Sequence, residues 1–173
     1  MEKRRVLNTT LALIMDGDKI LLGEKKRGFA KGTFNGIGGK QDPGESIYEA
    51  MVRETQEEIG VTPLGGEIVG NIDFINILYK GERVDINLSI FKCTDFEGEI
   101  KETEEMIPDW FSKDNMPYDK MLPDDVSWFP LVMDGKNIKG TIEYGKTMND
   151  KTYFEIKEVE HSILTQKESE LVM

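Results

Sequence analysis

One stretch of this sequence decides how the chain folds: residues 39–61, which read GKQDPGESIYEAMVRETQEEIGV. Ser46 and Glu49 have the S-x-x-E spacing of a capping box, which satisfies the free N–H groups at the start of a helix. Gly60 stands where a residue in the left-handed conformation would end that helix. The spacing therefore predicts a helix that begins after Ser46 and ends at Gly60.

Two faces of this predicted helix differ in their chemistry. At about 100° per residue, one stripe should pack on a sheet, and it consists of Tyr48, Met51, Val52, Thr55 and Ile59. Glu54, Glu57 and Glu58 are three and four residues apart, so their carboxylates lie together on a neighbouring face and repel one another. Such a face can simply be solvated in an acidic protein. Alternatively it holds a cation, and oxygen ligands of this kind suit Mg²⁺ or Mn²⁺ rather than zinc.

The segments around the helix alternate between apolar runs and turns. Apolar runs over 7–15 and 19–22 flank a Gly17 turn and predict a hairpin, and the six glycines of 28–44 predict loops. After the helix we expect strands over 68–79 and 84–93, an acidic loop over 95–105, a short strand at 110–111, a capped helix over 124–132, and a hairpin of 138–144 with 152–159. Strands on both sides of one helix predict an α/β fold with helices packed on a mixed sheet.

Length and composition limit the possible classes of protein. The 173 residues suit one domain, with a core over 5–160 and a flexible tail over 161–173. The apolar run 11–15 is too short for a membrane span or a secretory signal. A net charge of −11 argues against long nucleic acid as a partner. The lone Cys93 favours the reducing cytoplasm, and the single His161 leaves carboxylates as the expected acids and bases.

Residues 39–61 also fit the Nudix box, G-x5-E-x7-R-E-U-x-E-E-x-G-U with U aliphatic, at Gly39, Glu45, Arg53, Glu54, Glu57, Glu58, Gly60 and Val61. By this pattern the chain resembles the Nudix hydrolase family. Thr55 departs from it at a U position on the buried stripe, where we expect some local loss of stability and no loss of chemistry. Further similarity lies in 25–29, 35–36, 38–40, 123–125 and 128–130. These segments resemble the branch that converts oxidised purine nucleoside triphosphates, such as 8-oxo-dGTP, to a monophosphate and pyrophosphate.

The resemblance implies an α/β/α sandwich and a metal-dependent active site. In that family Mg²⁺, with Mn²⁺ as a substitute, would be bound here by the Gly38 carbonyl, Glu54, Glu57, Glu58 and Glu105. One carboxylate must take a proton from the attacking water, and the resemblance leaves Glu57, Glu58 and Glu105 as candidates. Arg53 is expected to orient the glutamates through ion pairs, a role compatible with simple pairing to Glu57 one helical turn away.

The same resemblance assigns residues to the substrate. Asn35, Asp124 and Asp125 would read the base, and the rest of the binding site would include Thr10, Lys25, Phe29, Ile37, Gly38, Gly39, Lys40, Phe74, Leu122 and Pro123. Asp124 has a second interpretation as a helix N-cap. Leu122 occupies the place of a tryptophan that stacks on the purine in these relatives, so about 1–3 kcal/mol of stacking is lost.

Three functions remain to be compared. The first is hydrolysis of an oxidised purine nucleoside triphosphate to sanitise the nucleotide pool. The second keeps this chemistry but acts on undamaged or otherwise modified nucleotides. The third is a nucleotide-binding module without turnover, which the intact box disfavours. All three predict a small nucleotide as the ligand, and the sequence leaves the oligomeric state open, with a monomer plausible.

Overall fold

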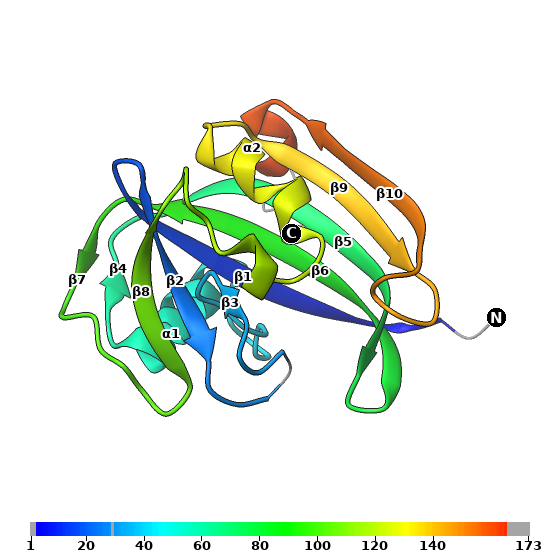
Figure 1. The fold of residues 1–173 in the computed structure, drawn as a ribbon, viewed down its shortest axis with the longest axis horizontal. Coiled ribbons are helices and arrows are strands. Elements are labelled where there is room, and N and C mark those ends of the chain that lie inside the picture. Colours follow the sequence, from blue (N-terminus) through cyan, green and yellow to red (C-terminus); the bar gives the residue numbers. More distant parts are fainter. Residues whose placement is uncertain (1–2, 29, 166–173) are drawn as a thin grey trace.

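A computed structural model describes residues 3–28 and 30–165 and shows a main mixed sheet with helices on both faces, together with a separate sheet of two short strands (Figure 1). The strands and helices are β1 (Arg5–Asp16), β2 (Lys19–Lys25), β3 (Phe34–Asn35), α1 (Ile47–Ile59), β4 (Thr62–Pro63), β5 (Glu67–Tyr79), β6 (Glu82–Cys93), β7 (Phe96–Glu97), β8 (Met106–Ser112), η1 (Tyr118–Lys120), η2 (Asp125–Ser127), α2 (Phe129–Met133), β9 (Ile138–Tyr144) and β10 (Lys151–Glu158). The described strands of the main sheet run in the order β10-β9-β5-β6-β1-β2-β3, and β8 also pairs with β2.

Strand β1 lies near the centre of this sheet and organises the site. It pairs in parallel with β6, from Arg5 opposite Val84 to Ile14 opposite Cys93. It pairs antiparallel with β2 through the turn at Gly17, whose φ of 62° a glycine adopts without strain. The pairs β5–β6 and β9–β10 are also antiparallel, whereas β5–β9 is parallel. The predicted hairpins and the two long strands between them are confirmed.

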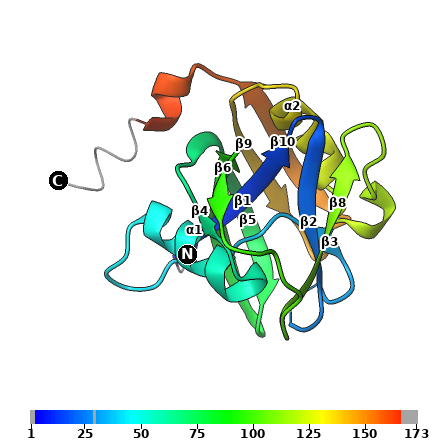
Figure 2. The same ribbon diagram turned by 90° about the vertical axis from the view of Figure 1, so that its left-hand side faces the viewer.

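Alternate residues of β1 supply two separate cores. Leu11 and Leu13 belong to a cluster that includes Phe129 of α2, whereas Ala12 and Ile14 belong to a cluster beneath α1. Figure 2 shows α1 and α2 on opposite sides of the sheet. The predicted α/β/α arrangement is therefore confirmed. Within the described residues, none of the helices combines the length and apolar character needed to cross a bilayer.

Helix α1 forms as its end signals predict. The Ser46 hydroxyl accepts a hydrogen bond from the Glu49 N–H at 3.0 Å, and the Glu49 carboxylate accepts one from the Ser46 N–H at 3.1 Å. Gly60 ends the helix with a φ of 78°. The buried residues of the stripe include Met51, Thr55 and Ile59, and Glu58 on the neighbouring face is buried as well.

In the C-terminal half, one predicted strand is present but longer than expected, and one predicted helix was wrong. The expected short strand at 110–111 is part of the seven-residue β8, which pairs with β2 along its length. Pro108 and Asp109 obscured this strand in the sequence, but an outer strand tolerates proline. The expected helix over 124–132 is divided into η2 and α2, and neither has a side-chain cap. The proline at 130 fits the first turn of α2, whereas inside one continuous helix over 124–132 its missing N–H and its ring would break the hydrogen-bond ladder. The N-cap interpretation of Asp124 is wrong.

The first residues of the segment that was expected to be a flexible tail are ordered in the structure. Residues 161–165 form a helical turn, and Leu164 is only 3% exposed because it joins the core beneath α1. The remainder of the predicted tail, 166–173, lies outside the described residues. The fold therefore extends a few residues beyond the expected limit of 160.

Thr55 provides a test of how this core tolerates a polar side chain. Its hydroxyl is fully buried and donates to the Met51 carbonyl at 2.8 Å, although that carbonyl already belongs to the helical ladder. Thr55→Val replaces a desolvated hydroxyl by a methyl group, so the free energy of unfolding should rise by roughly 0.5–1.5 kcal/mol. Denaturant unfolding measures the change. The exposed Thr152→Val is the control and should be neutral; a less stable Thr55→Val would contradict this account.

Candidate active site

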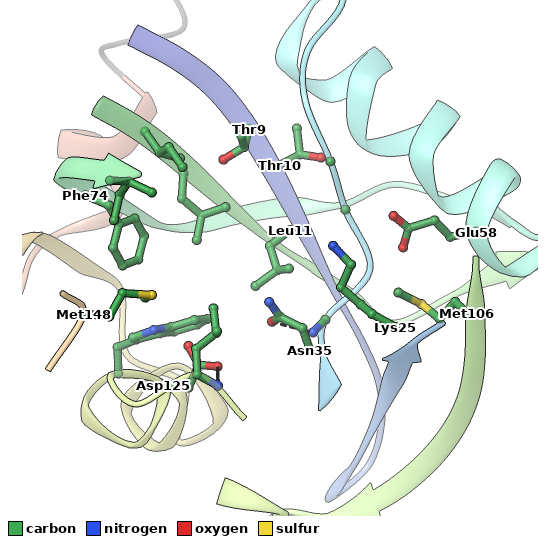
Figure 3. A pocket seen from close by; sticks show the side chains of 18 residues that line it. Thr9, Thr10, Leu11, Lys25, Asn35, Glu58, Phe74, Met106, Asp125 and Met148 are labelled. Atoms are coloured by element: carbon green, nitrogen blue, oxygen red, sulfur yellow. Dashed lines mark hydrogen bonds between the residues drawn. The ribbon is translucent and has the colours of Figure 1, made fainter. Parts of the chain in front are cut away.

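A pocket of about 210 Å³ opens between the N-terminal half of β1 and the loop before α2 (Figure 3). At one end, Figure 3 shows Phe74, Met148 and Asp125, and at the other Lys25 and Glu58. Leu11 and Asn35 lie between these groups. One continuous cavity therefore joins an apolar end to a charged end, so a ligand with an apolar ring and an anionic tail could occupy both.

The apolar end is formed by side chains on the face of the sheet that α2 covers. Its walls include a second aromatic ring besides Phe74, since Trp128 lines the cavity and stacks on Phe129 with ring centroids 4.0 Å apart. The further apolar lining residues are Ile77, Ile86, Leu88 and Leu122. The indole N–H of Trp128 is buried and lies close to the Asp125 carboxylate. A flat heterocycle with one or two polar edge atoms would match this surface.

The charged end is formed where the glycine-rich loop lies against β1. Thr10 N–H donates to the Gly39 carbonyl at 2.9 Å, and Ile37 exchanges two backbone hydrogen bonds with Ala12. A Cβ at Gly38 would stand 1.8 Å from the Thr10 carbonyl oxygen. Only glycine permits this approach, which places the loop backbone directly beside the carboxylates of α1.

Arg53 connects that loop to the helix. Its guanidinium donates to both carboxylate oxygens of Glu45, at 2.9 and 2.7 Å, and to Glu54 at 2.9 Å and Glu57 at 3.2 Å. It also donates to the Lys40 carbonyl at 2.9 Å. The bonds from Arg53 lower the pKa of Glu45 to about 2. The predicted ion pairs of Arg53 with the glutamates are present.

Glu58 faces the pocket without such a partner. It is 7% exposed, and its Oε2 is buried with no hydrogen-bond partner among the described residues. Burial, followed by the charges of Glu54 and Glu105, raises the pKa of Glu58 to about 8. Burial also raises the pKa of Glu54, although Arg53 opposes the effect. This end of the pocket therefore stabilises added positive charge.

The donor set fits a divalent cation, but it is not assembled into a cage. Among residues 3–28 and 30–165, no three acidic, histidine or cysteine side chains are arranged closely enough to hold a metal. Arg53 draws Glu54 and Glu57 toward itself, and Arg27 pairs with Glu105 at 3.2 Å. The unpaired oxygen of Glu58 and the oxygen-only chemistry favour a hard cation. Arg53 contacts one oxygen each of Glu54 and Glu57, so a cation could bind through the other oxygens while the arginine continues to orient the two side chains.

The structure brings half of the predicted site residues together in one pocket. The pocket is lined by Thr10, Lys25, Asn35, Gly38, Gly39, Glu58, Phe74, Leu122 and Asp125. The other described residues of the predicted site are not part of this lining: Ile37, Lys40, Arg53, Glu54, Glu57, Glu105, Pro123 and Asp124. The Ile37 side chain is buried beneath α1 instead, and Lys40 and Pro123 are exposed. Phe29 lies outside the described residues.

Several lining residues were missed by the sequence analysis. They are Thr9, Leu11, Gly36, Ile77, Ile86, Leu88, Met106, Trp128 and Met148. The missed residues of β1 and β6 could have been found from the sequence, because successive side chains of a strand point to opposite faces of a sheet. The two neighbours of Thr10 in β1 and the two neighbours of Asn87 in β6 must therefore share the face that α2 covers. Met148 had no such signal, because its loop reaches the pocket only through the pairing of β9 with β5.

The two adjacent aspartates diverge. Asp125 lines the pocket, and its Oδ2 accepts a hydrogen bond from the Leu122 N–H at 3.2 Å. Burial, with a smaller contribution from the Asp124 charge, raises the pKa of Asp125 to about 7. Asp124 instead accepts hydrogen bonds from Tyr144 and Lys151. Asp125, rather than Asp124, therefore presents its carboxyl group to a ligand.

The buried charge of Glu58 has a consequence for stability. Its folded pKa lies above the ordinary value of 4.5, so its contribution to stability is present below about pH 4.5 and is lost as the pH rises through about 8. In protein freed of metal by a chelator, Glu58→Gln should match wild type near pH 4.5 and exceed it by roughly 1–4 kcal/mol near pH 8.5.

Chemical denaturation at both pH values measures this difference. Glu104→Gln, at an exposed position on the loop before β8, is the control and should not differ from wild type at either pH. Adding a divalent cation near pH 8.5 should stabilise wild type more than Glu58→Gln. A Glu58→Gln protein that is no more stable than wild type near pH 8.5 would show that the carboxylate is adequately compensated without a cation.

Comparison with known proteins agrees with this site. A family model described as the NUDIX domain matches residues 5–132. Oxidized purine nucleoside triphosphate hydrolases of Danio rerio and Mus musculus are 42% and 38% identical over 135 residues, which are 78% of this chain and 85% of either relative. A MutT protein structure from Bacillus halodurans matches with a TM-score of 0.73 at 30% identity, over 87% of this chain and 97% of that one. Nudix hydrolases generally use divalent metal ions. The chain belongs to the Nudix family and is a Nudix hydrolase.

Proposed function

We propose that this protein is a Mg²⁺-dependent pyrophosphohydrolase that converts an oxidised purine nucleoside triphosphate, such as 8-oxo-dGTP, to the monophosphate and pyrophosphate. The observation that carries the proposal is the single cavity with an apolar, aspartate-bearing end and a carboxylate-rich end that also holds Lys25. A purine with its sugar would fill the first end and direct its phosphates to the second. The names of the two vertebrate relatives support the same substrate class.

At the charged end, Glu54, Glu57, Glu58, Glu105 and the Gly38 carbonyl would hold Mg²⁺, with Mn²⁺ as a substitute. When bound, the metal supplies charge neutralisation on the phosphates and a lower pKa for an attacking water. Lys25 lines the same part of the cavity and can donate to a phosphate oxygen. With these residues, a protein with a net charge of −11 can still bind a polyanionic substrate.

The proton of the attacking water needs a carboxylate acceptor. Glu57 and Glu105 each have an arginine partner, at 3.2 Å in both cases, and Glu58 has none within the described residues. Glu58 is also the member of this group that lines the pocket. All three remain candidates for the general base, and Arg53 is proposed to orient Glu54 and Glu57 rather than to touch the substrate.

At the apolar end, Asn35 and Asp125 would read the edge of the base. An amide donates and accepts at once, and a carboxyl group with a pKa near 7 can do either. Phe74 and Trp128 provide ring contacts. Leu122 contributes apolar area but no π-face for stacking on the base. This favours a second candidate function, in which the same hydrolysis acts on undamaged or otherwise modified purine nucleotides. Such an enzyme would discriminate less strongly in favour of the oxidised base.

The cellular setting is part of the proposal. The strongly negative net charge favours free nucleotides over long nucleic acid and disfavours anionic membrane surfaces. The buried thiol of Cys93, whose pKa burial raises to about 11, suits a reducing compartment without requiring one. We propose a cytoplasmic monomer.

A panel of triphosphates with Mg²⁺ tests the assignment. Pyrophosphate release should be fastest, as kcat/KM, for 8-oxo-dGTP, followed by dGTP and dATP, with dCTP lowest. Glu57→Gln keeps the shape of a half-exposed side chain, so folding should survive. It should nevertheless lower turnover at least about a hundredfold, because metal catalysis supplies several kcal/mol.

Each part of the proposed function would be contradicted by a different result. Near-normal turnover by pure Glu57→Gln would contradict metal catalysis at the box. Release of inorganic phosphate in place of pyrophosphate would contradict the bond that we assign. A dCTP rate equal to the purine rates would contradict purine recognition, and equal rates for dGTP and 8-oxo-dGTP would select the second candidate.

A further inference from the structure

Asp124 lies beside the pocket but directs its carboxylate away from it. Its side chain is 3% exposed. One carboxylate oxygen accepts a hydrogen bond from the Tyr144 hydroxyl, and the other accepts one from the Lys151 ammonium group. Asp125, the next residue, belongs to the pocket lining. The carboxyl groups of the adjacent residues Asp124 and Asp125 therefore have different surroundings. The difference is that two residues of the C-terminal hairpin, Tyr144 and Lys151, bind Asp124.

The positions of Tyr144 and Lys151 follow from the fold. The two residues are directly paired across β9 and β10, at the ends of the connecting loop. Asn76 donates to the Tyr144 carbonyl at 2.8 Å, and Arg83 donates to the Lys146 carbonyl at 3.0 Å. The Lys151 ammonium group also lies 5.6 Å from the centre of the Phe154 ring. These bonds attach the loop between β9 and β10 to the sheet. The backbone from which the Lys151 side chain extends to Asp124 is therefore held in place.

The chemistry of these contacts matches a buried negative charge. A carboxylate removed from water is costly unless it is paired and hydrogen-bonded. Lys151 provides the positive charge while its own side chain stays 37% exposed. Tyr144 provides a neutral donor, and burial and the nearby Asp124 both raise the pKa of Tyr144, so its hydroxyl keeps its proton.

Other ionisable groups surround Asp125. Tyr118 of η1 and Tyr144 of β9 both experience its charge, and Asp124 adds a charge of the same sign. Across the pocket lie Lys25 of β2 and Glu58 of α1. From the C-terminal hairpin, Lys151 contributes a positive charge that is bonded to Asp124, the residue next to Asp125.

We propose that Tyr144 and Lys151 are positioning residues for base recognition, which hold Asp124 as a charge-compensated carboxylate outside the pocket so that Asp125 alone presents a carboxyl group to the base. The inference rests on the proposed function and deepens it. As an acid, Asp125 donates its O–H to a carbonyl on the edge of a base; as a carboxylate, it accepts from an N–H. Purine selectivity is then governed by one proton on one residue.

Removing the charge of Lys151 tests the proposal. In Lys151→Met the positive charge beside Asp124 is lost, so the ionised form of the neighbouring Asp125 is less favoured and Asp125 keeps its proton to higher pH. We expect the midpoint of the pH dependence to rise by about half a pH unit or more. The quantity to measure is the ratio of kcat/KM for 8-oxo-dGTP to that for dCTP, because this ratio cancels titrations at the phosphate end. The change should appear in KM rather than kcat.

Three further variants separate positioning from structure. Lys157→Met removes the same charge from the same strand, where Lys157 pairs only with the exposed Glu155 at 3.5 Å among the described groups, and should leave the midpoint unchanged. Lys151→Arg restores the ion pair and should restore the midpoint. Tyr144→Phe removes one donor and should shift the midpoint in the same direction as Lys151→Met. A Lys151→Met midpoint that equals the Lys157→Met midpoint, or falls, would overturn the proposal.

A measurement without turnover distinguishes this proposal from the proposed function. In ligand-free protein carrying ¹³C at the aspartate carboxyl carbons, NMR follows the titration of Asp125, assigned with Asp125→Asn. The Asp125 midpoint should rise in Lys151→Met and not in Lys157→Met, even if no purine triphosphate is hydrolysed. An unchanged Asp125 midpoint in Lys151→Met would overturn the positioning role whatever the enzyme's substrate proves to be.

Discussion

The guanidinium of Arg53 is the interaction on which the site depends. It joins the loop before α1 to the helix itself, through both oxygens of Glu45, the Lys40 carbonyl, and the carboxylates of Glu54 and Glu57. A planar group with five donors can serve several acceptors at once, which a lysine ammonium group cannot do in this geometry. The glycine-rich loop lies against β1 on one side and against Arg53 on the other, so the orientation of the helix and the path of the loop are set together.

One arginine does not neutralise all of the acidic groups around it. Its strongest contacts are with Glu45, whose pKa falls to about 2. Glu58, buried and turned into the pocket, receives no contact from an arginine among the described residues, and its pKa rises to about 8. The structure thus separates a compensated group that orders the loop from an uncompensated group that favours a divalent cation. At the other end of the pocket, Asp124 is compensated by Lys151, and Asp125 is left to face the ligand.

The sequence predicted local features well and long-range ones less well. Ser46, Glu49 and Gly60 are end signals within one helix, and the spacing of its glutamates follows from helical geometry alone. The pairing of Asp124 with Tyr144 and Lys151 was not foreseen, because it depends on how β9 is placed beside β5, far from Asp124 in the chain. The same holds for Met148. Strand β8 was underestimated because Pro108 and Asp109 are unfavourable in most strands, and only its outer position makes them acceptable.

Divalent-metal affinity in Arg53→Lys tests the central claim most directly, with Mn²⁺ binding followed by electron paramagnetic resonance. A lysine keeps the charge but loses the shared contacts with Glu45, Glu54 and Glu57, so affinity should fall about 10–100-fold, as expected when a group that orients metal ligands is removed. Arg4→Lys, which changes an outlying pair with Asp85, should bind Mn²⁺ as wild type does. Wild-type affinity in a folded Arg53→Lys protein would contradict the account, because the carboxylates would then be arranged without the arginine.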